Sequence, residues 1–106
     1  MLKVILNRYI PFGRGMLAIN LFGVVFAKRP LSIVEQNHEY IHTLQQRELL
    51  WVGFYVLYVV EWLWRFMQTR GALRAYFHIS FEREAYEHER DLQYAQHRRP
   101  FEWWRC

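Results

Sequence analysis

The feature that most constrains the fold is an uninterrupted apolar run of twelve residues, LLWVGFYVLYVV, at positions 49–60. Twelve residues in a helix extend about 18 Å, which is shorter than the roughly 30 Å hydrocarbon core of a bilayer. Glu61 interrupts the apolar sequence and Arg65 follows it. The run therefore predicts either a buried core helix or a helix that lies in a membrane interface, with residues 49–67 as the membrane-associated segment.

Composition indicates one folded domain over residues 1–106. Hydrophobic residues make up 53% of the chain and aromatic residues 19%, which excludes a disordered protein because disordered chains are poor in aromatics. A chain of 106 residues can bury one core but has no room for separate modules. So much aromatic surface must be buried inside the domain, between subunits or against lipid, and self-association into a homo-oligomer is one expectation.

The charged residues, the single cysteine and the N-terminal sequence bear on the partners and the location of the protein. Fourteen basic residues against ten acidic ones give a net charge of +4, but the arginines are scattered and no nucleic-acid motif is present, so we expect no nucleic-acid partner. The single cysteine, Cys106, cannot form an internal disulfide, which fits a reducing compartment. Because the first fifteen residues lack an apolar signal-peptide region, we predict a cytoplasmic protein without a signal peptide.

The first thirty residues form the β-rich part of the chain. Residues 16–28, MLAINLFGVVFAK, contain many β-branched and aromatic side chains. They predict an extended segment or a hairpin that bends at Asn20 to Gly23. The sequence PFGRG at 11–15 predicts a turn before this segment.

Residues 31–106 are predicted to be helical. Ser32 and Glu35 form an S-x-x-E capping box, in which each side chain binds the backbone of the other residue, so a helix begins at about Ile33. Gly53 is a predicted break between this helix and the apolar run. The sequence thus predicts a mainly α protein with a small N-terminal β element (α+β).

The last part of the chain predicts one further helix. The sequence QTRG at 68–71 predicts a turn. Ser80 can cap a final helix that continues to about His97. Apolar residues recur along it at spacings of three and four, which gives the helix one semi-apolar face.

The predicted first helix carries H-E-x-x-H as His38, Glu39 and His42. Residues four apart lie on the same face of a helix, so the two imidazoles can bind one metal ion. Zinc accepts neutral imidazole nitrogen at about 2.0–2.1 Å. Glu39 can reach a water molecule at such a metal, accept its proton and return the proton to a leaving amine. The pattern therefore predicts a zinc site of a hydrolase.

A catalytic zinc normally has three protein ligands, so a third one must come from elsewhere in the chain. The acidic candidates lie in ISFEREAYEHE, residues 79–89. At about 100° per residue, Glu84 lies about 60° from the centre of the apolar face and Glu82 about 100°. Helical geometry alone leaves both glutamates open as the third ligand.

H-E-x-x-H followed tens of residues later by a helix with E-x-x-A resembles the gluzincin group of zinc metallopeptidases, in its minimal and membrane-associated forms. The second motif falls on Glu82, Arg83, Glu84 and Ala85. The resemblance implies that Glu82 is the third ligand, that Zn²⁺ is the cofactor, and that a zincin-like helical core packs the H-E-x-x-H helix against the glutamate-bearing helix. Tyr86 stands where such peptidases often have an aspartate bonded to a ligating histidine.

The chain also resembles a set of small bacterial proteins that combine an H-E-x-I-H-x-x-Q-Q helix with ISFEREAY. The similar residues run from NHEYIHTLQQREL through FYVLYVVEW to ISFEREAY, which is more than half of the chain. This likeness implies a shared fold. It implies no particular substrate.

Several other residues have expected supporting roles. Tyr86 and His78 lie one turn either side of Glu82 and are candidate donors to a developing oxyanion. Gln45 and Gln46 either bond to a ligand or face solvent. Glu61 should have a structural role with an arginine partner, because an unpaired charge in an apolar stretch is costly. The candidate partners are Arg47, Arg65 and Arg74.

Two functions are consistent with these features. The first is a zinc-dependent metallopeptidase that holds a peptide or protein substrate extended along residues 16–28, since an edge strand can bind a peptide through backbone hydrogen bonds. The second is a catalytically weak or inactive zincin scaffold that binds a membrane surface or a protein partner.

Overall fold

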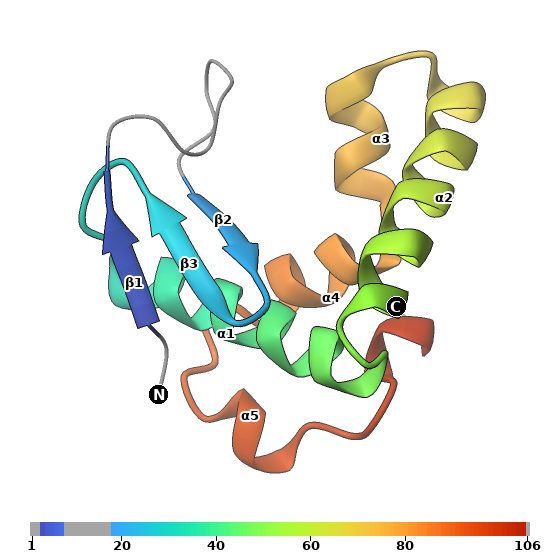
Figure 1. Ribbon diagram of the computed structural model, residues 1–106. Helices are drawn as coiled ribbons and strands as arrows, with labels where there is room; N and C mark the ends of the chain where they lie inside the picture. Colours follow the sequence, from blue (N-terminus) through green and yellow to red (C-terminus); the bar gives the residue numbers. More distant parts are fainter. Residues whose placement is uncertain (1–2, 8–17, 106) are drawn as a thin grey trace.

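The computed structural model describes residues 3–7 and 18–105, and Figure 1 shows a small sheet beside a group of helices. The predicted turn at 11–15 and Cys106 lie outside the described residues. The strands are β1 (Lys3–Leu6), β2 (Ala18–Leu21) and β3 (Val24–Ala27). All of the described helices follow them in the chain, so the prediction of a mainly helical protein with a small N-terminal β element is confirmed.

The three strands form one sheet in the order β1-β3-β2. β1 runs parallel to β3, and β2 pairs antiparallel with β3 through a two-residue turn. Phe22 and Gly23 form this turn with φ values of 53° and 85°, as a tight hairpin requires. Of the two alternatives predicted for residues 16–28, the structure therefore has the hairpin, and β2 forms an edge of the sheet.

Helix α1 (Ile33–Glu48) begins at the predicted capping box. The Ser32 hydroxyl accepts the Glu35 backbone N–H at 3.1 Å, and the Glu35 carboxylate accepts the Ser32 N–H at 2.8 Å. These bonds satisfy two N–H groups that have no partner inside the helix. The start of the helix that carries His38 and His42 is thus determined by its own sequence.

Helix α2 (Val52–Thr69) meets α1 at an angle of 109°. The break lies at Leu50 and Trp51, which have positive φ values of 54° and 64°. The predicted break at Gly53 is wrong by a few residues, because Gly53 belongs to the first turn of α2. Both alternatives for the apolar run remain open: one side of α2 packs on the core through Phe54, Tyr55 and Tyr58, whereas the other side of the helix is exposed.

The region after α2 contains more helices than predicted. Helix α3 (Ala72–His78) was not predicted, and the turn predicted at 68–71 is confined to Arg70 and Gly71 because α2 continues to Thr69. Helix α4 (Ser80–His88) has Ile79 as its N-cap, so the prediction that Ser80 caps it is wrong. The chain then forms α5 (Tyr94–His97) and a short 3₁₀ helix, η1 (Glu102–Arg105).

The single helix predicted from Ser80 to about His97 is interrupted after His88. The Asn37 side chain on α1 donates to the carbonyl oxygens of Glu89 and Asp91 at 2.8 and 2.9 Å. The Asp91 carboxylate accepts the Gln93 backbone N–H at 3.1 Å. These side-chain bonds replace the helical ones, which explains why a continuous amphipathic pattern does not form a continuous helix.

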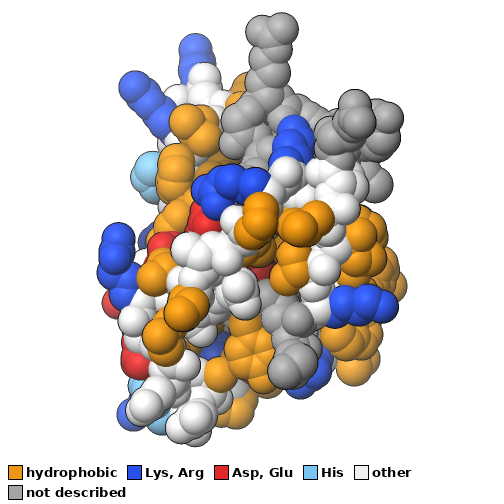
Figure 2. All heavy atoms as spheres, turned by 90° about the vertical axis from the view of Figure 1, so that its left-hand side faces the viewer, with side chains coloured by type: hydrophobic (Ala, Val, Ile, Leu, Met, Phe, Trp, Pro, Cys, Tyr) orange, Lys and Arg blue, Asp and Glu red, His pale blue; other side chains and the backbone are white. Residues whose placement is uncertain are grey.

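Helix α1 packs against α4, and α2 and α3 stand side by side above them in the view of Figure 1. Ile41 on α1 forms one core cluster with Ala85 and Tyr94. The other cluster joins α2 to the C-terminal part of the chain through Phe54, Ile79, Phe81 and Trp103. Figure 2 shows the side on which β1 lies, where basic side chains are separated by hydrophobic and polar ones.

The predicted arginine partner of Glu61 is Arg65, whose Nε lies 3.8 Å from the Glu61 carboxylate. The same carboxylate accepts the Ser80 backbone N–H at 2.9 Å and the Ser80 hydroxyl at 2.7 Å. Glu61 therefore satisfies the first residue of α4 from a neighbouring helix. Its role is structural, as predicted, and it fixes the start of the helix that carries Glu82.

Candidate metal centre

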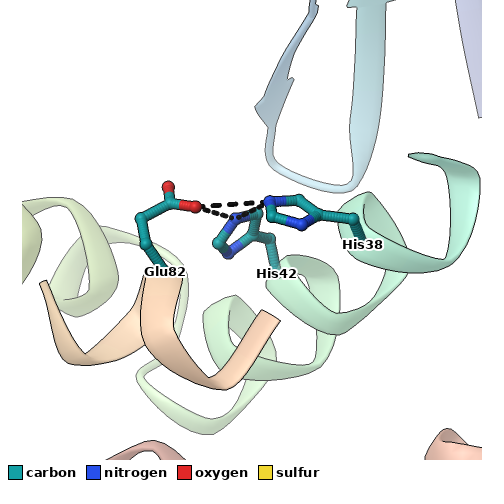
Figure 3. Close-up of side chains that lie close together, drawn as sticks. All are labelled: His38, His42 and Glu82. Carbon is teal, nitrogen blue, oxygen red and sulfur yellow. Dashed lines mark hydrogen bonds and ion pairs between the residues drawn. The ribbon is translucent and has the colours of Figure 1, made fainter. Parts of the chain in front are cut away.

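His38, His42 and Glu82 form a buried group that could hold a metal ion. Figure 3 shows the two imidazoles extending from α1 and the carboxylate from α4, with all three directed at one point. Glu82 Oε1 lies 3.3 Å from His38 Nε2 and 3.1 Å from His42 Nε2. The two Nε2 atoms are 3.2 Å apart. The predicted third residue, Glu82, therefore lies beside both histidines.

These distances match the coordination geometry of a small tetrahedral ion. Two ligands bound at about 2.0–2.1 Å in a tetrahedron are about 3.3–3.4 Å apart. The three measured separations, 3.1, 3.2 and 3.3 Å, are close to this value. Two imidazole nitrogens and one carboxylate oxygen are also a donor set that zinc accepts. The residues thus fit a zinc ion in both geometry and chemistry.

The hydrogen bond of Gln45 determines which nitrogen of His42 is free. The Gln45 amide nitrogen donates to the Phe81 carbonyl and to the Glu84 carboxylate, both at 2.9 Å. Its amide oxygen must therefore face His42, whose Nδ1 lies 2.8 Å away. An acceptor in this position requires a proton on Nδ1, which leaves the Nε2 lone pair directed toward Glu82.

Glu89 has the same effect on His38. Its carboxylate lies 3.1 Å from His38 Nδ1 and accepts the proton on that nitrogen. Glu89 thus provides a carboxylate contact to His38 that Tyr86, which has no carboxylate, cannot provide. The sequence did not reveal this role, because Glu89 lies beyond the end of α4, where Asn37 holds its backbone. The spacing of residues in a regular helix could therefore not predict the contact between Glu89 and His38.

Three lone pairs therefore converge on one point, and such an arrangement requires a cation, either a proton or a metal ion. Burial alone would lower the pKa of His42, but the adjacent Glu82 carboxylate raises that pKa to about 9. Burial would conversely raise the pKa of Glu82, whereas His42 and His38 hold it well below its usual range. The electrostatics of the group favour an ionised carboxylate with positive charge beside it.

Glu84, the alternative third ligand, points away from the histidines. Its carboxylate forms an ion pair with Arg98 and accepts the Tyr94 hydroxyl at 2.7 Å. Burial would raise the pKa of Glu84, but hydrogen bonds from Arg98, Gln45 and Tyr94 lower it. Glu84 lies near the apolar face of α4, as its helical position predicted, but that face packs on the core cluster of Ile41 and Tyr94.

Glu39 lines the same cleft as His38, His42 and Glu82. Burial raises the pKa of Glu39, although His42 and His38 act in the opposite direction. The cleft has a volume of about 860 Å³ and lies between the β2 edge of the sheet and the α2–α3 pair. It is thus large enough for several residues of an extended peptide.

The β2 edge is held beside the cleft by two polar side chains. Asn20 donates to the Glu39 carbonyl and to the Thr43 hydroxyl, both at 2.8 Å. Gln46 donates to the Asn20 carbonyl at 3.1 Å and accepts the Gly23 N–H at 3.2 Å. Gln45 and Gln46 are therefore both buried, and neither of them faces solvent.

Three tyrosines lie beside the group of His38, His42 and Glu82. The Tyr58 hydroxyl donates to Glu82 Oε2 at 2.7 Å, so that Oε1 alone faces the histidines. The Tyr86 ring contacts His38 with a centroid separation of 4.5 Å, and its hydroxyl lies 2.9 Å from that of Tyr76. Tyr58 and Tyr76 were not predicted, because their hydroxyls reach the site from apolar helix sequences without a distinguishing motif.

His78, the other candidate donor, does not belong to this group. Its Nδ1 lies 2.7 Å from the Arg74 carbonyl oxygen, and its side chain is exposed at the end of α3. His78 also does not line the cleft. Of the two predicted oxyanion donors, only Tyr86 lies at the cleft.

Comparison of the chain with protein-family models, curated proteins and solved structures gives no match.

Proposed function

We propose that the protein is a zinc-dependent metallopeptidase in which His38, His42 and Glu82 bind the ion and Glu39 is the general base. The main support for this proposal is the triangle formed by His38 Nε2, His42 Nε2 and Glu82 Oε1. Its sides of 3.1 to 3.3 Å match the ligand separations of a tetrahedral zinc site. Three protein ligands leave the fourth position for water or substrate, as catalytic zinc sites require. The adjacent cleft gives a substrate access to that position.

A zinc ion at this site would polarise a peptide carbonyl and lower the pKa of a water molecule. The Glu39 carboxylate would accept one proton from that water as the C–O bond forms. It would then donate the proton to the amide nitrogen as the C–N bond breaks. Burial supports this role, because a carboxylate with a raised pKa is a stronger base.

Tyr86 is the candidate donor to the oxyanion that develops on the carbonyl. Its hydroxyl is bonded to the Tyr76 hydroxyl at 2.9 Å. When Tyr76 is the donor in this pair, the Tyr86 proton is free to bind a substrate oxygen. The substrate peptide would extend along β2, where backbone groups of an edge strand can bind a peptide.

The test compares the wild-type protein with Glu39→Gln, each loaded with one equivalent of zinc. The probe is a mixture of peptides from a digested proteome, and new termini are counted by mass spectrometry. We expect Glu39→Gln to keep its zinc and to cleave about 10²–10⁴ times more slowly, as loss of a general base predicts. Equal cleavage by both proteins would exclude a catalytic role for Glu39.

Metal binding without cleavage in either protein would contradict the peptidase proposal. The expected alternative, a zincin scaffold that binds a membrane surface or a partner without hydrolysis, would then account for the site.

A further inference from the structure

The outer face of α2 is a broad apolar surface that no part of the chain within residues 3–7 and 18–105 covers. We define this face by its exposed residues; Val52, Trp64 and Met67 have 63, 57 and 71% of their surface accessible. It extends along the whole helix, which is unusual for a protein of this size. Its members are Val52, Val56, Leu57, Val59, Val60, Leu63, Trp64, Phe66 and Met67.

The width of the outer face favours a flat apolar medium over a single partner helix. At about 100° per residue, its members cover an arc of about 180°, half of the helix circumference. A helix that packs on one partner helix needs only the narrow seam of a coiled coil. A helix that lies in a membrane interface can bury such a wide arc among acyl chains.

The charges around the outer face are predominantly positive. Residues 52–78 contain three arginines and one acidic residue, Glu61, which is paired with Arg65 at 3.8 Å on the side of α2 away from the outer face. Glu61 is directed inward, where its carboxylate accepts two hydrogen bonds from Ser80. Arg70 and Arg74 are exposed at the end of α2 and on α3. The surface near the α2–α3 turn therefore complements anionic headgroups.

We propose that the outer face of α2 docks on a bilayer that contains anionic phospholipids, with Arg70 and Arg74 at the headgroup phosphates. No single helix among the described residues is long and apolar enough to cross a membrane, although α1 and α2 together, as a pair bent by 109°, are so by length and composition. The proposed contact is interfacial, with α2 lying along the membrane surface. Phe54 and Tyr58 line the metal cleft from the opposite side of α2. Docking therefore leaves that side of the helix free.

The first experiment sediments the full chain with vesicles of phosphatidylcholine, with or without about 30% phosphatidylglycerol. We expect binding to the anionic vesicles and a loss of at least tenfold in Val56→Glu/Val60→Glu, because two buried apolar side chains become charged. The matched control is Ile33→Glu/Leu92→Glu, which has the same change in charge at exposed apolar positions outside α2. The control should bind like the wild type.

The second experiment tests the electrostatic part. Arg70→Gln/Arg74→Gln should reduce binding to anionic vesicles about 30-fold, as expected for two arginines near an anionic surface, and should leave binding to neutral vesicles unchanged. Circular dichroism and zinc content should match the wild type in all variants, which separates this proposal from the proposed hydrolase function.

Absence of wild-type binding to the anionic vesicles would overturn the proposal. A wild-type dimer that persists with vesicles, and that Val56→Glu/Val60→Glu dissociates, would also overturn it, because a second copy would then cover the outer face. Light scattering with and without vesicles distinguishes these outcomes.

Discussion

Gln45 Oε1 accepts the Nδ1 proton of His42 at 2.8 Å, so the free lone pair of that imidazole faces Glu82. The orientation of Gln45 is fixed by two acceptors on its amide nitrogen, one of them Glu84. The buried network that stabilises the fold is thus connected to a ligand of the proposed metal site. Glu84, although not a ligand, acts on the site through Gln45.

The two candidate glutamates should differ sharply in their effect on zinc. We expect Glu82→Gln to weaken zinc binding by at least about 100-fold, because it removes the anionic ligand. Glu84→Gln should retain the metal with a smaller loss of affinity, since it acts only through Gln45. Competition with a zinc-binding dye measures both affinities. Equal losses in the two variants would contradict the assignment of Glu82.

Glu89 should increase the metal affinity of the proposed site although it is not one of the proposed ligands. Glu89→Ala removes the acceptor for His38 Nδ1, and loss of such a partner typically costs about 10–100-fold in metal affinity. The matched control is Glu87→Ala, an exposed glutamate on α4 two residues earlier in the chain. The same dye competition checks this prediction, and a similar loss in the control would show that the contact between Glu89 and His38 is not the cause.

Arg98 should be the most important charged residue for stability. Its guanidinium lies 2.8 Å from Glu48 and 3.0 Å from Glu84 and is almost completely buried. Arg98→Met leaves both carboxylates without this cation and should lower the free energy of unfolding by about 3–5 kcal/mol. Urea denaturation measures the loss. Arg99→Met, at an exposed neighbouring position, is the control and should change the stability little.

The Glu35 capping box should make a contribution to stability that depends on pH. Hydrogen bonds from Arg29 and from the Ser32 backbone lower the pKa of Glu35 in the folded state. The unfolded state therefore binds this proton at a higher pH than the folded state. The stabilisation by the Glu35 carboxylate is therefore complete above the pKa that Glu35 has in the unfolded chain. It is lost as the pH falls through the lower pKa that Glu35 has in the folded protein.

Wild type should consequently be more stable than Glu35→Ala at about pH 7, and the difference should shrink at about pH 2.5. Urea denaturation at both pH values checks this expectation. A difference that is unchanged at the lower pH would mean that the carboxylate charge does not contribute.

The sequence predicted those parts of the fold whose signals are local. The capping box of Ser32 and Glu35 predicted the start of α1. The β-branched and aromatic residues of 16–28 predicted an extended segment or a hairpin that bends at Asn20 to Gly23. The end of α4 could not be predicted in this way, because Asn37 terminates that helix from a distant position in the chain. The apolar run of α2 left a core helix and an interfacial helix as alternatives, because an apolar sequence does not show which side of the helix packs on the rest of the protein.

The same distinction applies to the site. H-E-x-x-H placed two imidazoles on one helical face, and Glu82 followed from the E-x-x-A resemblance. Helical geometry alone slightly favoured Glu84, because it could not show that the apolar face of α4 packs on Ile41 and Tyr94. The bonds of Glu89 to His38 and of Tyr58 to Glu82 were not predicted, since they join distant segments of the chain.

Zinc stoichiometry tests the central claim most directly. The protein should be purified without chelator, stripped, reloaded with zinc and measured by elemental analysis beside His38→Ala and the exposed control His97→Ala. We expect one tightly bound zinc ion per chain in the wild type and in His97→Ala, and none in His38→Ala. Absence of bound zinc in the folded wild type, or its full retention by His38→Ala, would contradict the proposed metal site.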